Sequence, residues 1–171
     1  MAGFGGQKVS RKKKVKPKRN TQPNGENLLR SAIHYNLQGD IINAEKKYRE
    51  AIDIGYHHHS IFTNLGVICK NSGHTKEAEF LYKKAIETNP DDPDAYINLA
   101  NLYQILCDFE GAIALSSKSL ELKPNNPQAL ITLGWSHKEL GNLDQALAST
   151  LKSLELKPDN STTYTNLGSI Y

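Results

Sequence analysis

Asparagine recurs at one position of a 34-residue period. Asn64, Asn98 and Asn166 are separated from one another by multiples of 34 residues, and each stands immediately before a leucine. Thr132 takes the remaining place in the series. An asparagine amide offers both a donor and an acceptor, so it can pair with the peptide groups of an extended chain without reading its side chains. Equivalent positions on stacked helices lie about 10 Å apart, which predicts a ladder of polypeptide-binding groups. The same amides could instead bond neighbouring helices or water, and the sequence leaves both interpretations open.

The histidines and cysteines do not form a catalytic pattern. His34, His74 and His137 fall in separate segments, and no Ser/His/Asp or Cys/His arrangement or glycine-rich phosphate loop accompanies them. Two cysteines, Cys69 and Cys107, are too few for a disulfide framework and favour a reducing compartment. We therefore expect no catalytic site in this stretch, no cofactor and a cytoplasmic location.

Two clusters invite a metal interpretation. His57, His58 and His59 are consecutive, so on a helix they would point in different directions, and in a loop they would lack further ligands. We interpret them as a linker between repeats. Asp91, Asp92 and Asp94 are interpreted as helix-capping residues rather than a calcium loop. No metal site is expected.

Charge divides the chain into two parts. Residues 1–24 hold eight of the 21 Lys and Arg residues and no acid, which leaves 13 basic against all 18 acidic residues, a net charge of −5, in the remainder. The first part is predicted to be a disordered basic tail. It could contact nucleic acid or an anionic surface, although a solvated tail is favoured because no aromatic residues are interleaved. No apolar run approaches the 18 residues of a membrane span, so no transmembrane segment is expected.

The elements that must position these residues follow from the same 34-residue period. It also holds at Leu65, Leu99, Leu133 and Leu167, at Ala44, Ala78, Ala112 and Ala146, and at Pro90, Pro124 and Pro158. Within one unit, Phe62, Leu65 and Cys69 share a helical face, and Ala78 and Tyr82 share a second one. Each unit is therefore predicted to be a hairpin of two short amphipathic helices, with a glycine turn between them and small residues at their contact.

These residues resemble the tetratricopeptide repeat (TPR) family. Its pattern appears here as Phe62, Leu65, Gly66, Gly73, Ala78, Tyr82, Ala85 and Pro90, with Cys69 at the aromatic position that follows Gly66. Departures are Cys69 and His137 in a tyrosine position, and Ser116 and Thr150 in an aromatic position. The resemblance implies an all-α, right-handed solenoid over residues 25–171. We expect about four and a half repeats, at 25–58, 59–92, 93–126, 127–160 and, in part, 161–171.

In the TPR family the first helix of each hairpin lines a concave face that binds a protein or peptide. The resemblance therefore implies a groove formed by Asn64, Asn98, Thr132, Asn166, Asn101, Gln104, Val67, Ile97, Ile131, Trp135 and Lys138. Trp135 is a candidate hot spot, with ordinary packing as the alternative. The asparagine ladder resembles the one in the TPR arm of O-linked N-acetylglucosamine transferases.

Two functions are compatible with this pattern. The first is a protein-protein interaction scaffold. The second is the N-terminal substrate-recruiting arm of a larger enzyme, an O-GlcNAc-transferase-like glycosyltransferase, a sulfotransferase or a methyltransferase, with its catalytic domain beyond Tyr171. The second interpretation is motivated by the asparagine ladder and by a last unit that stops partway through its first helix, which leads us to expect a longer protein.

Overall fold

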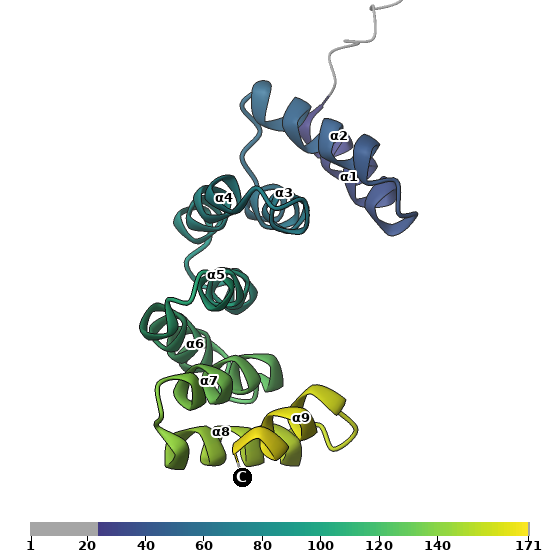
Figure 1. The fold of residues 1–171 in the computed structure, drawn as a ribbon. Coiled ribbons are helices and arrows are strands. Elements are labelled where there is room, and N and C mark those ends of the chain that lie inside the picture. The colour runs from purple at the N-terminus through teal and green to yellow at the C-terminus, as the bar shows by residue number, and fades with distance from the viewer. Residues whose placement is uncertain (1–23, 171) are drawn as a thin grey trace, which may run out of the picture.

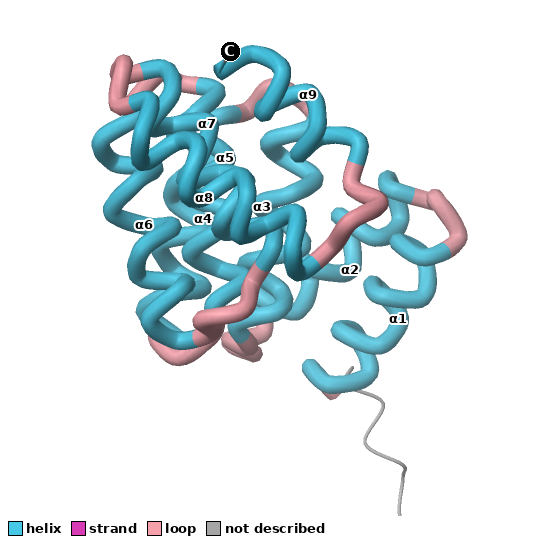
Figure 2. Tube along the Cα trace, turned by 90° about the horizontal axis from the view of Figure 1, so that it is seen from below, coloured by secondary structure: helices cyan, strands magenta, loops and turns pink. Residues whose placement is uncertain are grey.

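The computed structural model describes residues 24–170, which form helices joined by short loops, with no strand in that range (Figure 2). The predicted basic tail and Tyr171 lie outside the described residues. The helices are α1 (Gly25–Leu37), α2 (Ile41–Asp53), α3 (His59–Asn71), α4 (Thr75–Thr88), α5 (Pro93–Ile105), α6 (Phe109–Leu122), α7 (Pro127–Glu139), α8 (Leu143–Leu156) and α9 (Ser161–Ile170). None of these helices is both long and apolar enough to cross a membrane.

Consecutive helices pair into hairpins. α1 packs mainly on α2, α3 on α4, α5 on α6 and α7 on α8, while α9 packs on α8 and α7. The hairpins form an arc, with α3, α5 and α7 on its inner side and α4, α6 and α8 on its outer side (Figure 1). The predicted all-α solenoid of helix hairpins is confirmed.

Side-chain caps begin the first helices of the later repeats, as predicted for the aspartate cluster before α5. Asp92 caps α5 by accepting a hydrogen bond from the Asp94 N–H at 3.0 Å, and Pro93 takes the first helical position. Asn126 caps α7 in the same way. Asn160 accepts from the Thr162 N–H at the start of α9. Each cap fixes where the first helix of a hairpin begins.

A left-handed residue ends the first helix in each of the four hairpins. Gly39, Gly73 and Gly141 have φ values of 76°, 79° and 76°, and Cys107 occupies the same place in the third hairpin with a φ of 60°. Glycine adopts this conformation without steric cost, whereas a residue with a Cβ is strained there. The Cys107 thiol is free and exposed.

Small residues allow the paired helices to approach closely. A Cβ at Gly66 would lie 2.6 Å from the Cε1 atom of Tyr82, and Ala78 and Ala85 are completely buried. Ser116 and Thr150 are also buried at the positions of Tyr48 and Tyr82 in earlier repeats. The predicted close helix contact is therefore present in repeats with and without the aromatic residue.

The tyrosine position of the first helices shows a local compensation. In the third hairpin the Tyr103 ring lies over Gly111, where an added Cβ would be 2.5 Å from the ring. One repeat earlier the smaller Cys69 takes the tyrosine position, and Glu77 stands where Gly111 stands. The Glu77 carboxylate lies 2.8 Å from the Arg49 guanidinium of α2, which also approaches the Cys69 sulfur at 4.0 Å. This ion pair therefore joins the first hairpin to the second.

The first junction differs from the others. Residues 54–58 connect α2 to α3 and include no proline, whereas the later junctions 89–92, 123–126 and 157–160 are one residue shorter and each include one. α2 also packs less extensively on α3 than α4 does on α5 or α6 on α7. On the inner side, α3, α5 and α7 each contact the next first helix, whereas α1 stands away from α3. This separation leaves space between α1, α3 and α5.

Candidate functional site

The candidate site is the inner face, which we define as the exposed side of α1, α3, α5, α7 and α9. Two pockets open along it. The N-terminal pocket lies among α1, α3 and α5 and has a volume of about 450 Å³. The C-terminal pocket lies between α7 and α9 and has a volume of about 420 Å³. Both are large enough for one or two side chains of an extended polypeptide.

The N-terminal pocket combines apolar, amide and acidic groups. Ile33 and Leu37 of α1 form its apolar wall and are 37% and 82% exposed. Asn36, Ser60, Thr63 and Asn64 add polar groups, and Asp92, Asp94 and His59 complete the lining. No lysine or arginine is among these lining residues.

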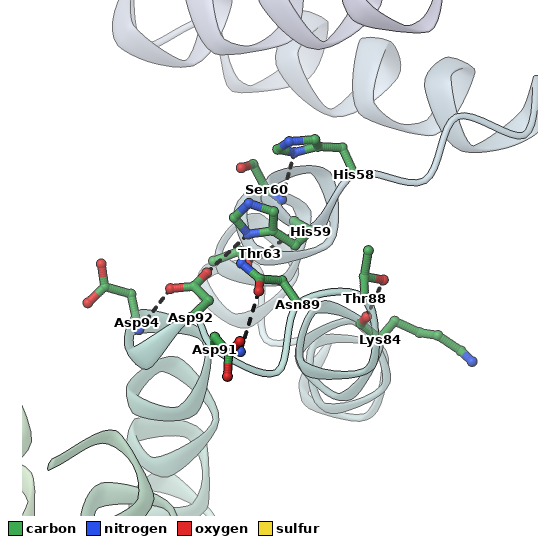
Figure 3. Close-up of polar contacts among 10 residues, drawn as sticks. All are labelled: His58, His59, Ser60, Thr63, Lys84, Thr88, Asn89, Asp91, Asp92 and Asp94. Atoms are coloured by element: carbon green, nitrogen blue, oxygen red, sulfur yellow. Dashed lines mark hydrogen bonds and ion pairs between the residues drawn. The ribbon is translucent and has the colours of Figure 1, made fainter. Parts of the chain in front are cut away.

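Two members of the histidine triplet, His58 and His59, lie at the repeat junction, and His59 lines this pocket (Figure 3). The His59 Nδ1 atom lies 3.1 Å from Oδ2 of Asp92, so the start of α3 is linked to the residue that caps α5. The His58 Nδ1 atom accepts a hydrogen bond from the Ser60 N–H at 3.3 Å and caps α3. Burial lowers the pKa of His58, and the neighbouring His59 lowers it further. His58 therefore caps α3, and His59 joins the start of α3 to Asp92. The described residues contain no group of three His, Cys, Asp or Glu side chains that could hold a metal ion.

The C-terminal pocket is centred on Trp135. Its indole ring is 44% exposed, and the indole N–H donates to Oε1 of Glu139 at 2.9 Å. The Lys138 ammonium lies 3.0 Å from the same oxygen. The Lys138 hydrogen bond lowers the pKa of Glu139, and the Trp135 hydrogen bond adds to this shift. Trp135 is therefore held in a fixed orientation while much of its ring stays accessible.

α9 supplies the opposite wall of the C-terminal pocket. Ser161, Thr162, Thr165 and Ser169 contribute hydroxyl groups, and Asn166 contributes an amide. The Asn166 Nδ2 atom is buried and has no hydrogen-bond partner among residues 24–170.

The predicted asparagine ladder is interrupted at its third position. Asn64 and Asn98 are partly exposed, as is Asn166. Thr132 is only 1% exposed, and its hydroxyl donates to Oδ1 of Asn101 at 2.9 Å. Thr132 and Asn101 therefore contact each other across α5 and α7, which matches the interhelical alternative left open by the sequence.

Other predicted groove residues also contribute to packing. The Gln104 amide donates to the Thr132 carbonyl at 2.8 Å and to the Ser136 hydroxyl at 2.9 Å. Ile97 and Ile131 are buried, and Val67 packs against the core with part of its surface exposed. The predicted set thus separates into exposed residues and residues that hold neighbouring first helices together.

The contribution of α1 is not among the residues predicted from the sequence. Ile33 lies one period before Val67, and Asn36 lies three periods before Lys138, so the 34-residue step contained a signal for both. His59 was treated as part of a linker, but it begins α3 and lines the N-terminal pocket. Its contact with Asp92 could not be deduced from spacing, because it depends on how two hairpins stack.

Comparison with known proteins gives one family match. The model described as "Anaphase-promoting complex, cyclosome, subunit 3" matches residues 71–153. No curated protein matches the chain. The family match lies in the central repeats and leaves out most of the N-terminal pocket.

Solved structures share the fold. A tetratricopeptide repeat protein from Parabacteroides merdae is 23% identical over 85% of this chain and 58% of that chain, with a TM-score of 0.73. The first TPR of Spaghetti (RPAP3) bound to the HSP90 peptide SRMEEVD is 24% identical over 66% of this chain and 89% of that chain, with a TM-score of 0.64. YrrB, a TPR protein with an unusual peptide-binding site, is 17% identical over 84% of this chain and 74% of that chain, with a TM-score of 0.75. At these identities the likeness concerns the fold.

Proposed function

This chain is a tetratricopeptide repeat protein, and from that premise we propose that it is a non-catalytic scaffold that binds a partner polypeptide in extended form along its inner face. The observation that carries the proposal is the presence of two pockets on one continuous series of first helices. An extended chain of about ten residues spans about 33 Å, enough to follow several stacked helices.

Two solved structures of the same fold support a polypeptide ligand. The RPAP3 repeat domain is bound to an HSP90 peptide, and YrrB is described as having a peptide-binding site. In this chain the proposed contacts are the exposed members of the predicted set. They are Asn64, Val67, Asn98, Trp135, Lys138 and Asn166, with Ile33, Asn36 and Leu37 added from α1.

Different contacts would supply different parts of the binding energy. The amides of Asn64, Asn98 and Asn166 would pair with ligand peptide groups, which fixes the ligand without selecting its sequence. Trp135 would supply the larger apolar contact, because a rigid exposed ring buries much area at little entropic cost. Ile97, Ile131, Thr132, Asn101 and Gln104 would act indirectly by holding α5 and α7 in register.

A selected ligand tests the proposal. Peptides of about 12 residues are selected from a displayed library against the full 171-residue chain, and the affinity of the best binder is measured by calorimetry. We expect Trp135→Ala to weaken binding about 30-fold or more, as for a hot-spot residue worth about 2 kcal/mol. Asn64→Ala with Asn98→Ala should weaken it about 5- to 30-fold through lost hydrogen bonds.

Matched controls lie on outer helices. Phe80→Ala removes an aromatic ring exposed on α4, and Gln145→Ala removes an amide exposed on α8. Both should leave the affinity unchanged. If the inner-face variants bound as tightly as the native chain, or if the controls weakened binding equally, the inner face would not be the binding surface.

A further inference from the structure

We propose that the N-terminal pocket binds the basic segment of this chain itself, residues 8–19, so that the tail competes with external ligands for one end of the inner face. This inference rests on the proposed function, because it assigns an occupant to part of the same face. It is an interaction within one molecule between an acidic, partly apolar pocket and a lysine-rich segment.

The pocket has the chemistry that a lysine or arginine side chain needs. Asp94 is exposed and forms no ion pair among the described residues, and Asp92 has only His59 within ion-pair distance. Ile33 and Leu37 lie on the same pocket and expose apolar surface. A basic side chain can lay its aliphatic stem along such a surface while its charged end reaches a carboxylate.

Charge complementarity favours the tail of this chain as the occupant. The chain from residue 25 onward has a net charge of −5, whereas residues 8–19 contain eight Lys and Arg residues and no acid. Val9 and Val15 lie within this basic segment and add small apolar groups that suit the Ile33 and Leu37 wall. Because the segment is covalently attached, its effective concentration at the pocket is of the order of millimolar.

The length of the intervening chain allows this contact. Ile33 lies eight residues after the start of α1, a distance of about 12 Å along a helix. Residues 20–24 connect the basic segment to α1, and five extended residues span about 17 Å. The segment can therefore reach back along α1 to the pocket without any change in the helices.

The pocket is accessible because of the first junction. α1 stands away from α3, so its apolar wall remains uncovered, whereas the later first helices contact one another. The backbone N–H of Asp94 donates to Asp92, and the Asp94 carboxylate has no ion-pair partner in the described part of the chain. An occupant would therefore add contacts without disrupting the cap.

Amide chemical shifts in the full chain test the inference. The tail variant carries Lys12→Gln, Lys13→Gln and Lys14→Gln. We expect it to move the backbone amide signals of Asn36, Thr63, Asn64 and Asp94 relative to the native chain. Raising the salt concentration from about 50 mM to about 500 mM should move the same signals in the same direction, because it screens the charges. These shifts should not change on about tenfold dilution.

Asp94→Asn and Asp144→Asn form a matched pair. Each aspartate is exposed at the second residue of its helix, α5 or α8, but only Asp94 lines the pocket. In the Asp94→Asn chain the tail substitutions should no longer shift the pocket amides, whereas in the Asp144→Asn chain the full shift should remain. Equal effects of the two variants would place the tail contact elsewhere and overturn the inference.

The remaining outcomes are also decisive. Pocket amides that do not respond to the tail substitutions would overturn the inference, and shifts that vanish on dilution would indicate the tail of a second copy. If the tail fills the pocket about nine-tenths of the time, the tail variant should bind the library-selected peptide about 10-fold more tightly. In one outcome, Trp135→Ala still weakens binding of that peptide while the tail substitutions leave the pocket amide shifts unchanged. In that case the proposed function stands and only this inference fails.

Discussion

Cys107 shows how one residue can depart from the repeat at a local cost. It adopts a φ of 60° where Gly39, Gly73 and Gly141 terminate the first helices of the other hairpins. The side chain is exposed, so its thiol makes no contribution to the core that would offset the strain.

Cys107→Gly should therefore raise the free energy of unfolding by about 0.5–1 kcal/mol, measured by urea denaturation. The gain is limited because glycine has more conformational entropy in the unfolded chain. Cys107→Ala is the control: it removes the sulfur but retains the Cβ, so it should give no gain. Equal stabilisation by alanine would mean that the thiol, and not the backbone conformation, is unfavourable.

At the scale of the helix pair, the same position of the repeat requires glycine in one unit and not in another. An added Cβ at Gly66 would lie 2.6 Å from the Tyr82 ring, whereas at Gly168, three repeats later, nothing lies within 4 Å among the described residues. The ring fixes how closely α3 can approach α4.

Gly66→Ala should lower the free energy of unfolding by about 1–3 kcal/mol, because the buried ring and the helix must shift. Gly168→Ala serves as its counterpart and should be neutral or stabilising by up to about 1 kcal/mol, since alanine is the better helix former. Thermal unfolding of both variants checks the pair. A similar loss for both substitutions would show that helix contact does not explain the glycine.

The start of α3 should make stability depend on pH. His58 must be neutral at Nδ1 to accept the Ser60 N–H, and its pKa is lowered in the folded protein. Below the ordinary histidine pKa of about 6.5, the unfolded state therefore binds more protons than the folded state does. The stability that the neutral His58 cap contributes is present above that pH and is lost as the pH falls below it.

His58→Asn should reduce the loss of stability between about pH 7.5 and pH 5.5, because asparagine caps a helix without titrating in that range. At pH 7.5 its stability should stay within about 0.5 kcal/mol of the native value. His137, whose pKa is also lowered by burial, contributes a pH dependence of the same sign that remains in the variant. Urea unfolding of the native chain and the variant at the two pH values measures this difference. An unchanged pH dependence of the unfolding free energy in the variant would contradict the role of His58.

At the scale of the whole molecule, each hairpin is stabilised by its contacts with the neighbouring hairpins. A solenoid has no contacts between distant repeats, so each junction contributes a separate interface term. The first junction has the least extensive packing between α2 and α3, and the Arg49–Glu77 ion pair spans it. The first hairpin should therefore open more readily than the central ones.

Hydrogen exchange can follow that opening. Arg49→Ala should lower the protection of α1 and α2 by up to about 1 kcal/mol, the upper range for a partly exposed ion pair, and leave α7 and α8 unchanged. Lys47→Ala is the matched control, because among residues 24–170 Lys47 pairs only with Glu50 inside α2. Equal losses in the two variants would indicate that helix propensity, and not the inter-repeat contact, controls the opening.

The sequence by itself determined the helices, their pairing and most of their ends. Leu65, Ala78 and the residues one period away from them define helix faces, because contacts at three and four residues along a helix are local. The Asp92–Pro93 and Asn126–Pro127 caps were predictable for the same reason, since each acts within one turn. The groove set, which includes Trp135, came from the family resemblance and stays a prediction.

Only the tertiary structure decided which first-helix residues remain accessible. Thr132 and Asn98 occupy equivalent positions, yet Thr132 is buried against Asn101 while Asn98 is partly exposed. The N-terminal pocket likewise exists because α1 stands away from α3. Both outcomes depend on the distance and rotation between successive hairpins. Packing across whole junctions sets that geometry, and a local sequence period does not contain it.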